Sequence, residues 1–276
     1  MKINFFVSIF ILFAGFKSLN AAENRIVIPY MEDVEIEWEM REKIDEMVLS
    51  KQSFIYVNLG LTNAELTLID RLKFNKISSE STSQYNCFGN LHLLEDELPI
   101  FLSEIGNNDE EVLQGVTKII SKTVNNVINA TGKATAWVCV RASTPNHLFD
   151  LPRWHTDGRY YGLNNPHPSS VPILKFAATL KGNHTLLYRL SDDMRNVLHQ
   201  NNRASLIELL DINNAESPSR GEGVFFIVAD NKMSAVHSEP RMNENRLFFS
   251  VLVGDESEIN ELFLRWHSMP KMTNTQ

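Results

Sequence analysis

Two apolar stretches, Gly221-Glu-Gly-Val-Phe-Phe-Ile-Val228 and Arg246-Leu-Phe-Phe-Ser-Val-Leu-Val253, decide the fold class. Both are short runs rich in valine and phenylalanine, and the first begins at a glycine turn, so both predict β-strands. The same texture, bounded mostly by Gly, Pro, Asn or Ser, recurs after Gly132 in residues 137–141, 173–180 and 185–190. Several short strands of this kind predict an antiparallel barrel or a jelly-roll sandwich.

The part of the chain before this β-rich half has helical signals. Thr62-Asn-Ala-Glu65 is a capping box, which should open a helix that ends near Lys73. Asn108-Asp-Glu-Glu111 begins the clearest helix, whose apolar residues from Val112 to Ile128 recur at helical spacing. Residues 76–91 have the polar composition of a loop. We therefore expect an α+β protein, with helices packed outside a late β core.

The expected boundaries follow these changes of texture. Residues 23–132 form a mainly helical support region, and residues 133–254 form the β core. Within the core, the polar insertion at residues 191–220 is either a lid or a solvated excursion. Residues 255–276 form a C-terminal helix and tail, because Asp255-Glu-Ser-Glu258 is a cap followed by apolar residues at helical spacing.

The first 22 residues have the layout of a secretory signal peptide. Lys2 gives a positive end, the apolar run from Phe5 to Phe16 follows, and small residues end at Ala22. The run is shorter than the about 20 residues that span a bilayer. An uncleaved anchor and a buried N-terminal helix are the alternatives. The signal peptide predicts export, to a periplasm, a secretory lumen or the medium.

Charge and cysteine content narrow the partners. The formal net charge is −8, and residues 1–22 carry two lysines and no acid, so cleavage makes the mature chain more acidic. An acidic chain without a basic cluster repels phosphate backbones, which argues against nucleic acid and against stable membrane association after cleavage. Cys87 and Cys139 are equally compatible with a disulfide and with free thiols.

A metal-binding pattern follows the first core strand. His155 and Asp157 are two residues apart, so on an extended chain their side chains point the same way, and Gly158 lets the chain turn away. Alone, this pair is also what two solvated loop residues would show. His237 lies late in the core, and two histidines with one carboxylate are the facial triad of non-haem Fe(II) oxygenases.

Arg246 begins an otherwise apolar run, nine residues after His237. A buried guanidinium needs a partner, and its planar fork suits a carboxylate. A structural ion pair with Glu239, Glu244 or another acid is the alternative.

The four residues in this order resemble the Fe(II)- and 2-oxoglutarate-dependent dioxygenases, especially the prolyl-hydroxylase-like branch. The resemblance covers about residues 136–254 and rests on His155-x-Asp157, the distal His237 and the later Arg246. The family often has a Gly-Gly-x-Thr-like turn between its metal motifs, and residues 182–185 stand there as Gly-Asn-His-Thr. The resemblance implies a double-stranded β-helix, which is a jelly-roll or cupin-like core.

The resemblance also implies roles for these residues. His155, Asp157 and His237 would hold Fe(II) and form the catalytic centre. Arg246 would bind the far carboxylate of the co-substrate 2-oxoglutarate. The assisting hydroxyl would come from Tyr161, Thr179 or Ser250, because Phe248 replaces the serine of the Arg-x-Ser seen in some branches.

Three further residues could bind the co-substrate or the substrate. Lys175 is a second possible anchor for 2-oxoglutarate, although an edge-strand lysine in solvent is the simpler interpretation. Arg159 and Tyr160, with Tyr161, would line the substrate entrance.

The activity implied by the resemblance consumes dioxygen and 2-oxoglutarate, releases succinate, and hydroxylates a C–H bond of a protein side chain or small molecule. A zinc hydrolase with the same three ligands is one alternative, and it needs an acid such as Glu239 at the fourth position. A non-catalytic exported binding module is another, and in it the three ligands would not converge. The two predictions conflict in one respect, because 2-oxoglutarate is abundant inside cells and the signal peptide predicts export.

Overall fold

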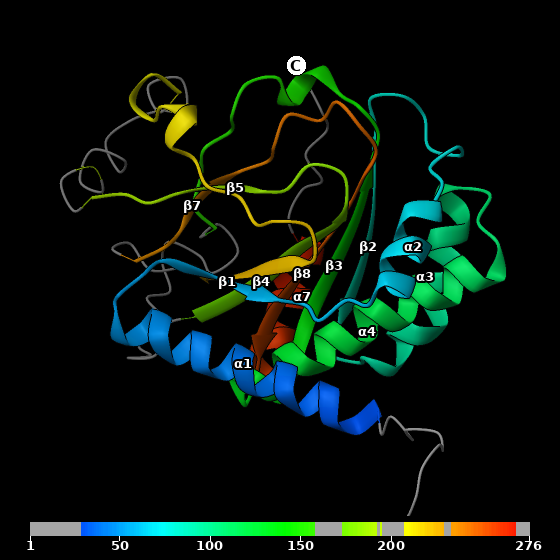
Figure 1. Cartoon of the computed structure of the whole chain (residues 1–276), viewed down its shortest axis with the longest axis horizontal. Helices are drawn as coiled ribbons and strands as arrows, with labels where there is room; N and C mark the ends of the chain where they lie inside the picture. Colours follow the sequence, from blue (N-terminus) through cyan, green and yellow to red (C-terminus); the bar gives the residue numbers. More distant parts are fainter. Residues whose placement is uncertain (1–28, 158–172, 192–193, 195–206, 229–232, 269–276) are drawn as a thin grey trace, which may run out of the picture.

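The computed structural model describes residues 29–157, 173–191, 194, 207–228 and 233–268. A six-stranded antiparallel sheet is its centre, with the strand order β1-β6-β4-β8-β3-β2 (Figure 1). Its strands, in chain order, are β1 (Phe54–Asn58), β2 (Thr82–Phe88), β3 (Thr135–Ser143), β4 (Ile173–Lys181), β6 (Glu222–Val228) and β8 (Arg246–Gly254).

A smaller sheet faces the large one. Its strands are β5 (Leu186–Tyr188) and β7 (Val236–Ser238), and single bridges extend it, from His155 to His237 and from Leu187 to Glu216. Along the chain, β3, β4, β6 and β8 belong to the large sheet. The segments at His155, β5, Glu216 and β7 belong to the small one. This arrangement is a double-stranded β-helix, so the predicted fold class is confirmed.

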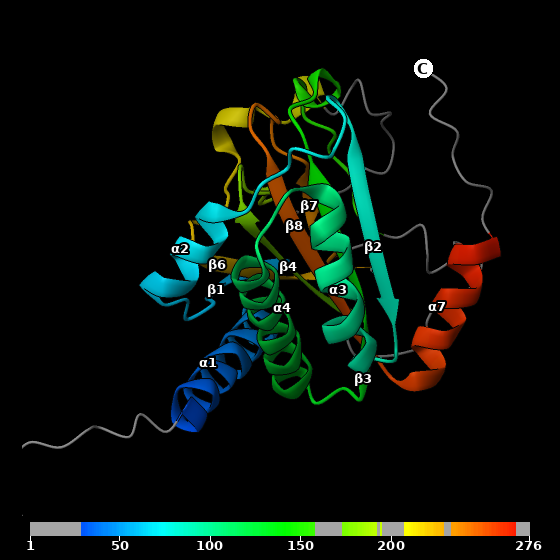
Figure 2. The same ribbon diagram turned by 90° about the vertical axis from the view of Figure 1, so that its right-hand side faces the viewer.

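Helices cover the other face of the large sheet. Figure 2 shows most of them on one side and α7 on a separate flank. The helices are α1 (Pro29–Leu49), α2 (Asn63–Arg71), α3 (His92–Ile105), α4 (Glu110–Thr131) and α7 (Glu256–Ser268), with short 3-10 turns η1 (His147–Phe149) and η3 (Ile212–Asn214). None of the helices in the described ranges is both long enough and apolar enough to cross a membrane.

The helical signals of the sequence have the expected physical causes. The Thr62 hydroxyl and the Glu65 carboxylate form the reciprocal capping box that opens α2. Asp109 caps α4 by accepting a hydrogen bond from the amide of Val112 at 3.0 Å. Gly132 ends α4 with φ of 65°, a left-handed conformation that glycine adopts without strain. The buried stripe of α4 packs on the sheet.

Alternation along the strands separates two environments. On β8, Leu247, Phe249 and Val251 belong to the core between the sheet and the helices. Phe248 and Leu252 belong to a second cluster on the opposite face. Because successive side chains of a strand point to opposite faces, one strand contributes to the helix-side core and to the cluster on the opposite face.

Two sequence predictions about strands are wrong. Residues 76–91 are not all loop, because β2 pairs with β3 from Thr82 to Phe88. β2 is an edge strand with mostly exposed or half-buried side chains, so its polar composition hid it. Lys175 does not lie on an edge strand, because β4 runs between β6 and β8.

The two cysteines are free and buried. Cys87 belongs to the helix-side core, and Cys139 belongs to the cluster on the other face of the sheet. A sheet separates the two thiols, which explains why they do not pair.

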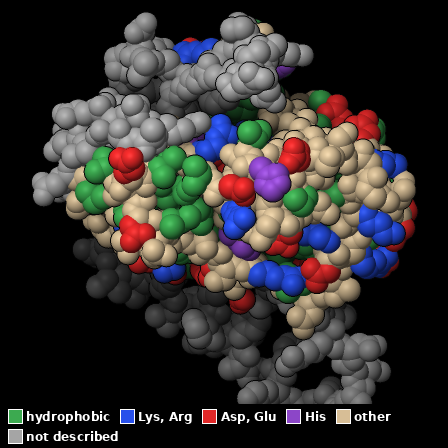
Figure 3. Space-filling view, turned by 90° about the horizontal axis from the view of Figure 1, so that it is seen from above, with side chains coloured by type: hydrophobic (Ala, Val, Ile, Leu, Met, Phe, Trp, Pro, Cys, Tyr) green, Lys and Arg blue, Asp and Glu red, His purple; other side chains and the backbone are tan. Residues whose placement is uncertain are grey.

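Other predictions stay predictions. The signal peptide lies outside the described residues, as does most of the first half of the 191–220 insertion. The division at residue 133 is not a break in the sheet, since β1 and β2 come from the N-terminal region. Figure 3 looks down on the top of Figure 1, and basic and acidic side chains are interspersed over the described part of that face.

Candidate metal centre and its cavity

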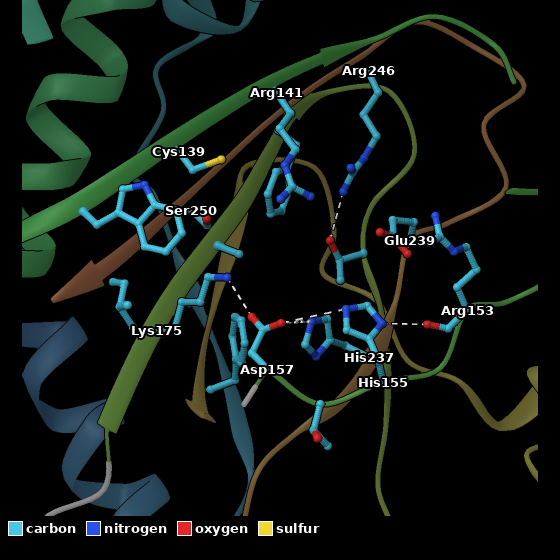
Figure 4. A pocket seen from close by; sticks show the side chains of 17 residues that line it. Cys139, Arg141, Arg153, His155, Asp157, Lys175, His237, Glu239, Arg246 and Ser250 are labelled. Atoms are coloured by element: carbon cyan, nitrogen blue, oxygen red, sulfur yellow. Dashed lines mark hydrogen bonds and ion pairs between the residues drawn. The ribbon is translucent and has the colours of Figure 1, made fainter. Parts of the chain in front are cut away.

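A cavity of about 510 Å³ lies on the face of the large sheet that turns away from α1, α2, α3 and α4 (Figure 4). β3, β4, β6 and β8 form its floor, and the His155 segment and β7 form a wall. Its volume is in the range of pockets that hold small molecules. The lining residues are Trp137, Cys139, Arg141, Arg153, His155, Thr156, Asp157, Lys175, Ala177, Thr185, Phe226, His237, Glu239, Arg246, Phe248, Ser250 and Leu252.

The structure brings His155, Asp157 and His237 together. Their potential ligand atoms all lie within 4.8 Å of one another. The Asp157 Oδ1 atom is 3.8 Å from Nε2 of His155 and 3.5 Å from Nε2 of His237. The two imidazole ring centres are 4.3 Å apart. Such an open facial arrangement is a donor set that suits Fe(II).

Backbone hydrogen bonds hold the two histidines side by side. The amide of each donates to the carbonyl of the other, at 2.9 Å from His155 and 3.0 Å from His237. Nδ1 of His155 lies 2.6 Å from the carbonyl of Arg153, and Nδ1 of His237 lies 3.2 Å from that of Ala235. A carbonyl only accepts, so each Nδ1 carries the proton and each Nε2 keeps its lone pair for a metal.

The electrostatics of His155 and Asp157 also favour a metal. Burial, followed by the neighbouring His237, lowers the pKa of His155 to about 4, so its imidazole is neutral near pH 7. Burial opposes ionisation of Asp157, but Lys175 and the two histidines hold the pKa of its carboxyl well below the usual range. Neutral imidazole and ionised carboxylate are the forms that bind metal ions.

Lys175 is neither in solvent nor on an edge strand, and it contacts a candidate metal ligand. Its Nζ atom lies 2.7 Å from Oδ2 of Asp157, and the lysine side chain is largely buried. This pair occupies one carboxylate oxygen and leaves Oδ1 facing the histidines (Figure 4). Lys175 therefore orients a candidate metal ligand, as outer partners of ligating carboxylates do.

Arg246 lines the same cavity and is only 3% exposed. Its Nε donates to the carbonyl of Asn183 at 2.8 Å, and its Nη2 donates to the hydroxyls of Thr185 at 2.9 Å and Thr179 at 3.2 Å. Burial lowers the pKa of Arg246 to about 9. Among the described residues it forms no ion pair, so the predicted alternative partner, Glu239 or Glu244, is not bound to it.

The turn at residues 182–185 wraps around Arg246. Gly182 has φ of +87°, and a Cβ atom there would lie 2.5 Å from the Asn245 carbonyl oxygen and 2.9 Å from Cα of Arg246. Only glycine permits so close an approach in this conformation. The turn then presents the Asn183 carbonyl and the Thr185 hydroxyl to the guanidinium.

The three hydroxyl candidates have different outcomes. Thr179 contacts Arg246. Ser250 is buried in the cavity wall without a recorded hydrogen bond to Arg246. Tyr161 lies outside the described residues, as do the substrate-entrance residues Arg159 and Tyr160. Thr185 was missed, although its place at the end of the glycine turn was a usable signal.

Two charged cavity residues, Arg141 and Arg153, were not assigned to the site from the sequence, and Glu239 was named only in the alternative interpretations. Arg141 follows Trp137 and Cys139 at two-residue spacing, so strand alternation puts all three on the cavity face. Arg153 lies two residues before His155, and Glu239 lies two residues after His237. The same alternation around the candidate ligands would have identified them.

No family model matches the chain, and no curated protein matches it significantly. Solved structures with a similar course of the chain include a dioxygenase for auxin oxidation from rice, which is 9% identical with a TM-score of 0.43 over 79% of this chain and 78% of that one. A prolyl-4-hydroxylase from Pseudomonas putida is 7% identical, with a TM-score of 0.40 over 78% and 98%. A prolyl hydroxylase from Trichoplax adhaerens, solved with a hypoxia inducible factor peptide, is 11% identical, with a TM-score of 0.39 over 90% and 99%. These likenesses are too distant to carry an argument.

Proposed function

We propose that this chain is an Fe(II)- and 2-oxoglutarate-dependent oxygenase that hydroxylates a C–H bond of a protein side chain or a small molecule. One observation carries the proposal: His155, Asp157 and His237 converge in a cavity that also contains the buried Arg246, which forms no ion pair with a described residue. A metal-binding triad and a carboxylate-binding arginine in one cavity are the two requirements of this chemistry.

The residues present fit the metal. Nε2 of each histidine and Oδ1 of Asp157 would be the three ligands, while Lys175 holds Oδ2. When bound, Fe(II) supplies the activation of dioxygen that hydroxylation requires, and the protein orients and shields that reaction. Phe226, Phe248 and Trp137 give the cavity an apolar surface beside the candidate ligands.

Arg246 fits the co-substrate. Thr179, Thr185 and Asn183 hold its guanidinium in place but do not neutralise it. A buried cation that forms no ion pair with a described carboxylate is costly, and a carboxylate from a ligand lowers that cost. The far carboxylate of 2-oxoglutarate would bind there while its oxo-acid end reaches the metal. Overall, 2-oxoglutarate, dioxygen and a C–H substrate would give succinate, carbon dioxide and the hydroxylated product.

The hydrolase alternative has one observation in its favour. Glu239 lines the cavity, and its Oε2 atom is buried without a hydrogen-bond partner. However, its carboxylate is not part of the group of ligand atoms that converge. Hydrolysis would also leave the buried charge of Arg246 without a purpose. The binding-module alternative required ligands that do not converge, and they do converge.

Turnover of the co-substrate tests the proposal. Decarboxylation of 2-oxoglutarate without the C–H substrate needs a reductant in its place, so the purified chain is given Fe(II), ascorbate, dioxygen and 2-oxoglutarate labelled on its first carbon. We expect labelled carbon dioxide and an equal amount of unlabelled succinate from the wild type. Arg220→Gln, a variant of a surface arginine that pairs with Asp70, should release as much of both products. His155→Ala should release neither. A metal-loaded wild type that releases no label, but hydrolyses esters or amides, would support the hydrolase.

Export is part of the same proposal. The N-terminal 22 residues support it by their positive end, apolar run and small residues. Expression with and without residues 1–22, followed by cell fractionation and N-terminal sequencing, tests it. A processed chain beginning near Glu23 outside the cytoplasm supports export, and an unprocessed cytoplasmic chain rejects it.

A further inference from the structure

The arginines of this protein fall into two groups. Nine arginines lie in the described residues, and six of them form ion pairs with carboxylates: Arg41, Arg71, Arg189, Arg220, Arg241 and Arg265. The other three are Arg141, Arg153 and Arg246, none of which forms an ion pair with a described carboxylate. All three line the cavity. Among the described residues, arginines without an ion pair therefore occur only where a ligand could supply the counter-ion.

Arg141 is held in position by a chain of hydrogen bonds. Its Nε donates to Oε1 of Gln84 at 3.2 Å. The amide nitrogen of Gln84 donates to Oδ1 of Asn86 at 3.0 Å, which also accepts from Nε1 of Trp137 at 3.1 Å. These contacts fix which way the Gln84 amide faces, and they aim the guanidinium of Arg141 into the cavity. An arginine fixed in this way loses little entropy when it binds an anion.

The positions of the arginines differ with respect to the candidate metal ligands. Figure 4 shows Arg141 and Arg246 extending toward the ligands from the same side, and Arg153 on the other side beside Glu239. Arg141 and Arg246 are close enough for the first to contribute to the lowered pKa of the second, after burial. Arg153 stacks over the ring of Phe149, 5.4 Å from its centre. Arg246 has an occupant under the proposed function, whereas Arg141 and Arg153 do not.

The charge of the cavity remains positive after the co-substrate is bound. Its described lining has four cationic side chains and two carboxylates, in a chain with a net charge of −8. Fe(II) and 2-oxoglutarate carry opposite charges of equal size and leave that balance unchanged. A positive cavity in an acidic protein attracts anions and disfavours cationic ligands.

We infer that Arg141 binds a carboxylate of the substrate, so that the substrate is a small organic acid. This inference rests on the proposed function and names the substrate class for that same cavity. The planar guanidinium of Arg141 makes two parallel hydrogen bonds to a carboxylate, and this fixes the orientation of the acid relative to the metal. The uncharged amide of the same acid lacks both the charge and one acceptor.

The test uses the full mature chain loaded with Mn(II), which occupies the site without turnover. Calorimetry first measures 2-oxoglutarate binding to the wild type, Arg141→Gln, Arg141→Lys and Arg220→Gln. Each 2-oxoglutarate-saturated protein then meets an equimolar mixture of small organic acids and their matched carboxamides. Unbound molecules are removed by rapid filtration, and mass spectrometry identifies those retained. Circular dichroism and thermal unfolding confirm that each variant is folded.

We expect the wild type and Arg220→Gln to retain acids over their amides. Arg141→Gln should lose acid retention by about tenfold or more, the loss expected for a hydrogen bond to a charged group. Arg141→Lys keeps the charge but loses the fork, so it should retain acids at an intermediate level, and this variant decides the matter if Arg141→Gln does not fold. All four proteins should bind 2-oxoglutarate within a few-fold of one another.

Several results would overturn the inference. They are equal retention of acids and amides, retention of no acid, and unchanged acid retention in Arg141→Gln. Loss of 2-oxoglutarate binding in Arg141→Gln alone would make Arg141 a co-substrate anchor and leave the proposed function intact. A metal-loaded wild type that does not bind 2-oxoglutarate would instead reject the proposed function, and this inference with it.

Discussion

The two faces of the large sheet differ more than any other two regions of the molecule. Toward the helices, β8 presents Leu247, Phe249 and Val251, which are fully buried in an apolar core. Toward the cavity, the same strand presents Arg246 and Ser250, which are almost as buried but polar. Burial alone therefore does not distinguish them. The difference teaches that one strand can supply stability with its odd-numbered residues and a ligand site with its even-numbered ones.

The largest expected effect comes from breaking the helix-side face. Phe249→Ala removes a fully buried ring that contacts Phe176, so it should lower the free energy of unfolding by about 3–5 kcal/mol. Urea unfolding followed by circular dichroism measures it. Ser250→Ala, the neighbour on the cavity face, is the matched control and should cost far less. Equal losses for the two variants would contradict the division of the faces.

Arg246→Met tests the cavity face in the opposite way. Removing the guanidinium should weaken 2-oxoglutarate binding by about 2 kcal/mol or more, which is about thirtyfold. The free energy of unfolding of the ligand-free protein should change by only about 1 kcal/mol, because three lost hydrogen bonds oppose the relief of a buried charge. Calorimetry and urea unfolding measure the two quantities. A large loss of stability with unchanged binding would make Arg246 a structural residue.

Metal binding should stabilise the protein through the cavity face. At a free Mn(II) concentration about a hundred times its dissociation constant, the free energy of unfolding should rise by about 2.7 kcal/mol. Thermal unfolding of the wild type with and without the metal shows this rise. His155→Ala removes one of the three converging ligands, so the same metal concentration should stabilise it much less. An equal rise in both proteins would place the metal elsewhere.

The smallest effect is expected at a surface arginine. The side chain of Arg220 is 53% exposed and pairs with Asp70. Exposed ion pairs contribute about 0–1 kcal/mol, so Arg220→Gln should leave both stability and 2-oxoglutarate binding nearly unchanged. The same urea and calorimetry measurements check it. A marked loss of co-substrate binding in this variant would remove the contrast between cavity and surface arginines.

The sequence was enough to predict most of the fold. Apolar β-branched and aromatic runs identified β3, β4, β6 and β8, and capping residues identified α2 and α4. Composition failed at β2, because an edge strand has one paired neighbour and a largely exposed surface. Only its register with β3 makes it a strand, and that contact is long-range.

The sequence predicted those residues of the candidate site that are close together in the chain or that have the spacing of the dioxygenase pattern. The His155-x-Asp157 pair and the distance from His237 to Arg246 placed four residues that the fold brings into one cavity. The ion pair of Lys175 with Asp157 was not predictable, because it depends on how β4 lies beside the His155 segment. Arg141 could have been found from the alternation of β3, but only once the cavity face was known.

The most direct test of the central claim is the visible spectrum of the Fe(II)-loaded protein without oxygen. If Arg246 and the His155–Asp157–His237 centre bind the two ends of one 2-oxoglutarate molecule, adding it should produce the weak charge-transfer band of a chelated oxo acid. The band should be absent in His155→Ala and should need about thirtyfold more 2-oxoglutarate in Arg246→Met. A folded wild type that binds Fe(II) and shows no band at saturating 2-oxoglutarate would contradict the account.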